Sequence, residues 1–487
     1  MKRCFLALLT VVVVLVQARA WAEPEEQWIE VQSSHFTVLT DGGEKPGRDL
    51  GQQFEQMRSV FAQLFLTQVK QLVPLQIIAL KDSRQISRYA PLYQGKPVRT
   101  AGFYLHSQDR DYIVLDLEAT NRWETVFHEY AHLLLAGNLP DLPPWFTEGF
   151  AEFYSTIQIN NKHATIGRPP ESALEILRSE PLMPVATLFS IDHNSPIYND
   201  DSNPRSIFYA ESWMVVHYLW DHNAMEQAQR YFQLIQQRVP VVDAIRQAFD
   251  MTPAQFDRAL QNYSRAVTEA LRVPLRQGLE QTHFSVHPVT SLDAKTALAG
   301  VHSHQASYQQ QAIHEFQEIL ERDPRNAAAH RDLGYIYYYQ HNPDAALPHL
   351  QIAAEEEPSD WRVHYFWAQM AAQKNDDALA PQIEREARLV TQLNPGFADG
   401  HGLLGFALMV ERRHAEATVA YQKAIALKPA SEIYALNLAE LYTLQGKLDE
   451  AKTLFLYLQN SGNDTIATAA RSHLELMDAP APKLRDE

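Results

Sequence analysis

The residues best suited to chemistry are a histidine, a glutamate and a second histidine in the sequence HEYAH, at His128, Glu129 and His132. On an α-helix, side chains four positions apart lie on one face, so His128 and His132 can both direct an imidazole at one metal ion. Glu129 would lie beside that ion, where a carboxylate can take a proton from a metal-bound water. The spacing predicts a metal centre on one helix, with Glu129 as a general base.

The helix that must carry this motif is apolar on most of its surface, which is typical of a buried helix. Asn121 is its predicted N-cap, and Gly137 with Asn138 is predicted to end it. Buried imidazole and carboxylate groups are costly unless they are satisfied, and a metal ion would satisfy all three together. A second helix is predicted from Trp145 to Tyr154, after a proline-rich loop.

Short strands and one long helix are predicted before the motif. The stretch 28–40 has apolar β-formers split by a polar turn, which predicts a strand or a short hairpin. Apolar residues recur three or four positions apart over 48–72, as in an amphipathic helix. Further strands are predicted over 75–80, 101–105 and 112–117. These elements would form the sheet that supports the motif helix.

The chain after the second helix is predicted to be mostly helical. Residues 155–205 are polar with several prolines, which favours a loop with one short helix at 172–178. Four further helices are predicted over 206–221, 224–238, 242–249 and 253–270. The result is an α+β domain, a small mixed sheet plus helices, over 23–272. Residues 273–290 lack periodicity and are predicted to be a linker.

A different pattern begins at about residue 290, where dipeptides ending in proline recur. They are Asp323-Pro324, Glu357-Pro358, Asn394-Pro395 and Lys428-Pro429, with spacings of 34, 37 and 34 residues. Between them, Leu333-Gly334 matches Leu404-Gly405. This is the tetratricopeptide-repeat (TPR) pattern of paired helices. It predicts an all-α TPR superhelix over 291–475 with a protein partner on its concave face, and a disordered tail over 476–487.

The composition is that of a folded globular protein, with 46% hydrophobic and 21% charged residues. The net charge of −17 repels phosphate backbones, so nucleic acid is excluded as a partner. The single cysteine is Cys4, which leaves the rest of the chain without disulfide or thiol chemistry.

The N-terminus has the pattern of a signal peptide over residues 1–22. Two basic residues precede the apolar run 5–16, and small residues follow at Ala18, Ala20 and Ala22. The run is short for a transmembrane span. We therefore expect an exported protein, periplasmic or secreted, without stable membrane insertion after signal cleavage. An uncleaved N-terminal anchor is the alternative.

The second helix reads WFTEGFAEFY and, with the motif, resembles the gluzincin superfamily of zinc metallopeptidases. Residues 28–270 are more specifically similar to the bacterial peptidase MA-like family of exported metallohydrolases, which often carry TPR repeats. The resemblance implies a zincin-like fold and one zinc ion per chain, held by His128, His132 and Glu148. A fourth coordination position would remain for water.

The same resemblance implies roles for three further residues. Glu129 would be the general base toward the zinc-bound water, and Glu152 would orient the ligand His128. Tyr209 would donate a hydrogen bond to the oxyanion, with a place in the core as its alternative. His217 is predicted to be structural. The aminopeptidase element Gly-x-Met-Glu-Asn is missing and the gap from His132 to the third ligand is short, so exopeptidase action is not expected.

Two functions from different classes follow. The leading hypothesis is an exported zinc metallopeptidase that hydrolyses peptide bonds, with TPR repeats that recruit a protein substrate or partner. The alternative is a non-catalytic TPR scaffold with a remnant zinc domain in an envelope protein complex. A hydrolase of cell-wall peptide would use the same residues as the first hypothesis.

Overall fold

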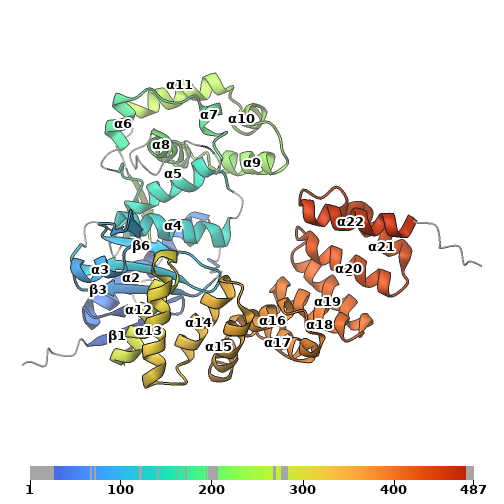
Figure 1. The fold of residues 1–487 in the computed structure, drawn as a ribbon. Helices are drawn as coiled ribbons and strands as arrows, with labels where there is room; N and C mark the ends of the chain where they lie inside the picture. Colours follow the sequence, from blue (N-terminus) through green and yellow to red (C-terminus); the bar gives the residue numbers. More distant parts are fainter. Residues whose placement is uncertain are drawn as a thin grey trace, which may run out of the picture. The chain divides into compact units, whose positions relative to one another are not determined.

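The structure is a computed structural model that describes residues 27–65, 69–70, 73–119, 123–139, 142–160, 162–170, 173–192, 195, 207–266, 270–275 and 283–478. The chain divides into two compact units, Met1–Ala294 and Lys295–Glu487, and each is described by itself (Figure 1). The predicted signal peptide over 1–22 lies outside the described residues, as do residues 479–487 of the predicted tail. Residues 476–478, also predicted as disordered tail, instead end the last helix. No described helix combines the length and apolar character that crossing a membrane requires.

A six-stranded mixed sheet supports the first unit, in the order β11-β1-β2-β3-β7-β6. Its strands are β1 (Trp28–Gln32), β2 (Phe36–Thr40), β3 (Leu75–Leu80), β6 (Gly102–Leu105), β7 (Asp111–Asp116) and β11 (Ser285–Val289). Strands β2, β3 and β7 are parallel, and the outer pairs are antiparallel. Every residue of β3 and β7 is buried, as expected for strands covered on both faces. The predicted hairpin over 28–40 and the three predicted strands are confirmed.

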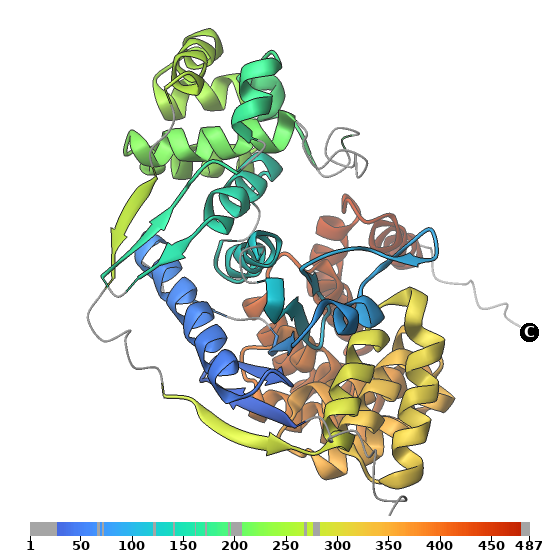
Figure 2. The same ribbon diagram turned by 90° about the vertical axis from the view of Figure 1, so that its left-hand side faces the viewer.

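Besides this sheet, the first unit contains helices. They are α2 (Glu44–Phe65), α3 (Ser83–Tyr89), α4 (Glu124–Asn138), α5 (Pro144–Ser155), α6 (Ala173–Ser179), α7 (Val185–Leu188), α8 (Ile207–Asp221), α9 (Met225–Gln236), α10 (Val241–Phe249) and α11 (Pro253–Ser264). Helix α2 packs along β1 and β2 (Figure 2). A smaller sheet joins β8 (Gln158–Ile159), β9 (His163–Ile166) and β10 (Leu271–Pro274), and β4 (Leu92–Tyr93) pairs with β5 (Lys96–Pro97).

The motif helix begins later than predicted. Asn121 lies outside the described residues, and Trp123 occupies the cap position without a side-chain cap. The indole Nε1 of Trp123 instead donates to the backbone oxygen of Asp116, at 3.1 Å. A contact with the end of β7 therefore helps to fix the start of α4.

The stretch predicted as a linker also differs. Residues Ser285–Val289 form β11, which pairs antiparallel with β1 at the edge of the main sheet (Figure 2). Pro288 is tolerated there because an edge strand leaves one side without sheet partners. The helix predicted over 253–270 ends at Ser264, and Leu271–Pro274 pairs with β9 instead. Both strands are short and pair with residues distant in sequence, which periodicity cannot detect.

The second unit is a row of helices, and from α13 onward each helix packs on the next. They are α12 (Ser291–Ser303), α13 (Gln309–Arg322), α14 (Ala327–Tyr339), α15 (Pro343–Glu356), α16 (Trp361–Gln373), α17 (Ala380–Leu393), α18 (Ala398–Val410), α19 (His414–Leu427), α20 (Glu432–Leu444), α21 (Leu448–Leu458) and α22 (Asp464–Asp478). The predicted helical repeats are confirmed. The spacing of 37 residues coincides with a 3-10 turn, Asp377–Leu379, inserted before α17.

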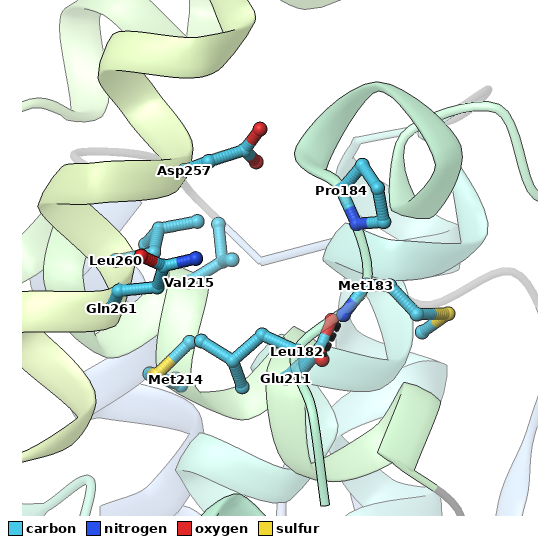
Figure 3. A pocket seen from close by; sticks show the side chains of 9 residues that line it. All are labelled: Leu182, Met183, Pro184, Glu211, Met214, Val215, Asp257, Leu260 and Gln261. Carbon is cyan, nitrogen blue, oxygen red and sulfur yellow. Dashed lines mark hydrogen bonds between the residues drawn. The ribbon is translucent and has the colours of Figure 1, made fainter.

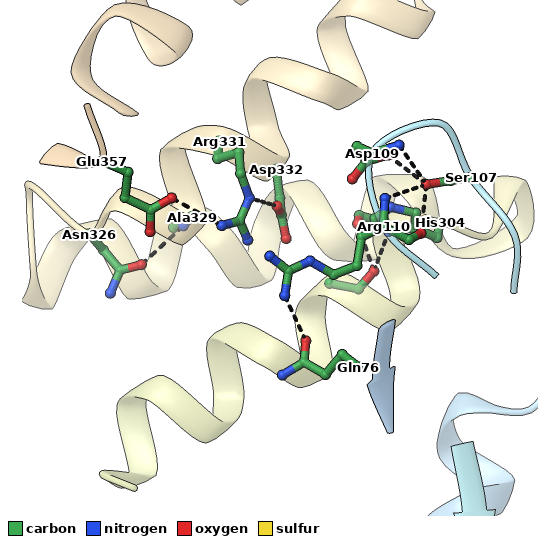
Figure 4. A network of polar contacts seen from close by, with 12 residues as sticks. Gln76, Ser107, Asp109, Arg110, His304, Asn326, Ala329, Arg331, Asp332 and Glu357 are labelled. Carbon is green, nitrogen blue, oxygen red and sulfur yellow. Dashed lines mark hydrogen bonds and ion pairs between the residues drawn. The ribbon is translucent and has the colours of Figure 1, made fainter. Parts of the chain in front are cut away.

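Recurring small and polar residues hold the helix pairs together. A Cβ at Gly334 would come within 2.6 Å of the Leu350 side chain, and one at Gly405 within 2.8 Å of Tyr421. Glycine at these positions therefore lets the two helices of a pair approach closely. At the start of α14, Asn326 accepts from the backbone N–H of Ala329 at 3.0 Å (Figure 4). The buried Arg331 pairs with Asp332 at 2.9 Å and with Glu357 at 3.3 Å (Figure 4).

Candidate metal centre

Two glycines let the helices of the motif pack closely enough to form a site. A Cβ at Gly102 of β6 would lie 2.2 Å from a methyl of Val126. The absence of a side chain at Gly102 therefore lets α4 pack directly against β6. A Cβ at Gly149 of α5 would lie 2.2 Å from the backbone oxygen of Ser212, so α5 crosses α8 at this glycine. Because Gly149 follows Glu148 directly, this crossing fixes the position of the Glu148 side chain.

The structure brings together the three side chains predicted as ligands. Nε2 of His128 lies 3.1 Å from Nε2 of His132, and each lies 3.3 Å from Oε2 of Glu148. A tetrahedral zinc ion with bonds of about 2.0–2.1 Å separates its ligand atoms by about 3.3–3.4 Å. The three atoms therefore have the spacing of a zinc ligand set. Among the described residues, this trio is the group of three side chains whose ligand atoms could hold a metal ion.

The fourth predicted participant, Glu152, lies one turn after Glu148. Its Oε1 is 3.5 Å from Nδ1 of His128, the nitrogen that faces away from the metal position. A carboxylate there favours the tautomer with a proton on Nδ1, which leaves Nε2 free to bind a metal. The predicted pairing of Glu152 with His128 is present in the structure.

Electrostatics make the centre attractive to a cation. Burial opposes the charge of Glu148, but hydrogen bonds to His128 and His132 outweigh it and hold the pKa of that carboxyl well below its usual range. Burial also acts to lower the pKa of His128, but Glu148, Glu152 and Glu129 together raise it. Three carboxylates around two imidazoles leave an excess of negative charge that a divalent cation would neutralise.

Glu129 is half-buried and has a neighbour that the sequence did not reveal. Burial raises the pKa of Tyr104 far above its usual value, and the charges of Asp111 and Glu129 add to this effect. The Tyr104 hydroxyl lies 3.2 Å from Nδ1 of His106, which is 2.8 Å from the carboxylate of Asp111. Tyr104 lies on the edge strand β6, which contacts α4. Tyr104 and Glu129 are distant in the sequence, and the order of the strands in the sheet brings them close together.

Tyr209 and His217 both lie on α8. The ring of Tyr209 lies 5.4 Å from that of Phe208 and packs against the core of the first unit. His217 is buried, and its Nδ1 lies 2.6 Å from the hydroxyl of Tyr263, which donates to Asp221. This chain of hydrogen bonds agrees with the structural role predicted for His217.

When the chain is compared with known protein families, the match lies in the second unit. The family model described as Tetratricopeptide repeat matches residues 310–338 and 332–396. These segments are TPR repeats. A curated relative, human Protein O-mannosyl-transferase TMTC1, is 29% identical over 125 residues, which is 25% of this chain. The chain spans 14% of the length of that relative.

Solved structures that resemble part of the chain include two that are titled TPR proteins. MamA is 19% identical with a TM-score of 0.31, and the match covers 39% of this chain and 100% of that chain. YrrB, titled a TPR protein with an unusual peptide-binding site, is 15% identical with a TM-score of 0.34, covering 37% and 90%. A thermophilic TPR protein from Thermus thermophilus is 18% identical with a TM-score of 0.28, covering 38% and 98%.

These comparisons overturn the prediction that the chain is a zinc metallopeptidase, because they relate it to TPR proteins and to a protein named as a transferase. The catalytic roles predicted for Glu129 and Tyr209 depended on that activity and are not retained. The comparisons favour the alternative function, a TPR scaffold that binds other proteins.

Proposed function

We propose that this chain is a scaffold whose TPR unit binds an extended segment of a partner protein. Alternate helices of the unit, α14, α16, α18 and α20, contact one another in addition to the helices that precede and follow them. They therefore line one common face. Five side chains on this face, here called the inner strip, are Tyr338, Tyr365, Gln369, Asp399 and Tyr434.

Contacts between successive helices make the inner strip continuous. The Tyr338 hydroxyl on α14 donates to Gln369 on α16 at 2.8 Å. Tyr365, also on α16, lies 4.9 Å from the ring of Phe397, directly before α18. Tyr434 on α20 donates to Asp399 on α18. Burial raises the pKa of Tyr365, and the charge of Asp399 adds to it, which agrees with a compact cluster.

The composition of the inner strip suits a peptide ligand. Tyr338, Tyr365, Gln369 and Asp399 are half-buried, so each keeps an accessible edge. Tyrosine provides a large contact area for little loss of conformational entropy and is enriched at binding hot spots. The accessible hydroxyls and the Asp399 carboxylate can bind backbone N–H groups and a basic side chain. The continuous inner strip is the observation that carries the proposal.

The test is to pan a displayed library of random peptides on the full-length chain and to measure the affinity of the retained peptides. Tyr365→Ala is expected to weaken them about tenfold or more, since truncation of a hot-spot residue typically costs about 2 kcal/mol or more. Val419→Ala is the matched control, because Val419 is 66% exposed and lies on α19, outside the inner strip. Retained peptides that bind Tyr365→Ala as well as the unaltered chain would refute the proposal.

We further propose that the first unit holds one zinc ion through His128, His132 and Glu148, in a zincin-like arrangement of α4 and α5. The support is the spacing of the three ligand atoms and the carboxylate of Glu152 beside His128. Zinc bound there would supply coordination bonds that join the two helices, so metal binding would stabilise the first unit. Metal analysis of the purified chain tests this, with about one zinc per chain expected.

A further inference from the structure

A cavity in the first unit is lined by two carboxyl groups among apolar side chains. It has a volume of about 90 Å³ and lies between α8, α11 and the segment that leads into α7. Its lining residues are Leu182, Met183, Pro184, Glu211, Met214, Val215, Asp257, Leu260 and Gln261 (Figure 3). None of them belongs to the candidate metal centre or to the TPR unit, so this cavity is independent of the proposed function.

The carboxyl group of Glu211 is the unusual feature of this cavity. Glu211 is only 2% exposed, and one of its oxygens accepts from the backbone N–H of Met183 at 2.6 Å (Figure 3). Among the described residues its other oxygen has no hydrogen-bond partner, although the side chain lines the cavity. A buried carboxyl with an unused oxygen is costly, and a donor in the cavity would remove that cost.

Asp257 supplies the second carboxyl group from α11. One of its oxygens accepts from the backbone N–H of Val185 at 2.7 Å, which fixes the side chain at the cavity. Burial and the charge of Asp257 raise the pKa of Glu211 to about 8, although the bond from Met183 acts in the opposite direction. The two acidic groups therefore repel each other when both are ionised, and a cation between them would relieve the repulsion.

The walls of the cavity decide which cation fits. Met214, Val215 and Leu260 are almost fully buried and provide an apolar surface. Gln261 and Pro184 are exposed, so the cavity opens to the surface on their side. About three waters would occupy 90 Å³, each taking about 30 Å³ of liquid volume. That space suits a short alkyl chain ending in an ammonium group.

We propose that this cavity binds an alkylammonium group, from a free primary amine or from a lysine side chain. The ammonium donates to Glu211 and Asp257, and the alkyl chain packs on Met214, Val215 and Leu260. The exposed side near Gln261 is the entrance.

The experiment is calorimetric titration of the full-length chain with n-butylammonium and, separately, with Nα-acetyl-lysine methylamide. Binding of either probe supports the proposal, and the tighter of the two shows whether a free amine or a lysine side chain is preferred. The neutral n-butanol is the ligand control. If neither n-butylammonium nor Nα-acetyl-lysine methylamide binds more tightly than n-butanol, the proposal is wrong.

The pH dependence provides a second readout. An alkylammonium keeps its proton up to about pH 10, whereas Glu211, with its pKa of about 8, is mostly protonated at pH 7. Binding at pH 7 must displace that proton, so n-butylammonium should bind about tenfold more tightly at pH 9 than at pH 7. An affinity independent of pH over this range would contradict the role given to Glu211.

Two variants separate the proposed site from a purely structural role. Glu211→Gln keeps an oxygen that can accept from Met183, so the fold should be retained while the affinity falls at least tenfold. Asp257→Asn should weaken binding similarly. Glu180→Gln is the matched control, because Glu180 is exposed and does not line the cavity. If Glu211→Gln unfolds the chain, Asp257→Asn decides, and unchanged affinity in that variant would overturn the proposal.

Discussion

Nε2 of His132 lies 3.3 Å from Oε2 of Glu148, although the two side chains come from different helices, α4 and α5. Without a cation this pair is an ordinary hydrogen bond. Nε2 of His128 also lies 3.3 Å from Oε2 of Glu148, so the three atoms form a triangle of candidate metal ligands, here called the ligand triangle. Several measurable consequences depend on this triangle and on the packing that produces it.

The first prediction concerns the metal. The full-length chain should bind about one zinc ion, and zinc at one hundred times its dissociation constant should stabilise it by about 2.7 kcal/mol. Glu148→Gln removes one ligand charge and should abolish most of this stabilisation. His287→Gln on the exposed edge strand is the control, and it should behave as the unaltered chain does. Equal zinc-dependent shifts of the melting temperature in both variants would contradict the proposed ligand set.

The second prediction concerns Glu152. Glu152→Gln keeps the size of the side chain but removes the charge that lies 3.5 Å from Nδ1 of His128. Loss of such a partner typically lowers metal affinity by about 10- to 100-fold. Competition with a chelator of known zinc affinity measures the change. Unchanged affinity would mean that Glu152 does not orient the ligand.

The third prediction concerns the crossing of α5 and α8. Gly149→Ala places a Cβ against the backbone of Ser212, which cannot move as a flexible side chain can. We expect a loss of about 2–3 kcal/mol in the free energy of unfolding, measured by urea denaturation. Gly462→Ala is the control, since nothing lies within 4 Å of a Cβ there. A stable Gly149→Ala variant would show that the helices are less closely packed than described.

The fourth prediction is a pH effect in the TPR unit. Burial lowers the pKa of His349 to about 4, and the neighbouring His330, at 2.8 Å between the Nδ1 atoms, adds to this. A histidine whose folded-state pKa is lowered contributes stability that is present above its unfolded pKa of about 6.5 and is lost as the pH falls toward 4. From pH 7 to pH 5 the unfolded state binds the proton and the folded state does not.

His349→Gln should therefore flatten this part of the pH profile. We expect the unaltered chain to lose about 1 kcal/mol more than the variant between pH 7 and pH 5, a value reduced because the ring is only partly buried. Urea titrations followed by helical circular dichroism at the two pH values provide the comparison. If both proteins lose the same stability, the His330–His349 pair is not the cause.

The sequence predicts the parts of the structure that local periodicity controls. The four-residue spacing of His128 and His132 places them on one face of a helix. The regular recurrence of prolines indicates helix pairs. The close approach of Glu148 depends on Gly149, whose role appears only when α8 is placed. Strand β11 was missed because its partner β1 is distant from it in the sequence, although the two strands are neighbours in the sheet. Tyr104 beside Glu129, and the cavity between Glu211 and Asp257, arise from elements that converge only in three dimensions.

The proposed function was also harder to predict than the fold. The motif and the glutamates of the following helix favoured a peptidase, because residue types and spacing describe a possible metal centre without describing turnover. The comparisons instead support TPR repeats in the second unit, and the proposed function rests on those repeats. The decisive question is therefore where a partner binds.

Amide hydrogen exchange of the full-length chain, with and without a saturating peptide retained from the library, answers this question most directly. We expect slower exchange in α14, α16, α18 and α20, the helices that carry the inner strip and line its face. Helices α13, α15, α17 and α19 should change little. Protection confined to α13, α15, α17 and α19, or to the first unit, would contradict the proposal that the inner strip is the binding surface.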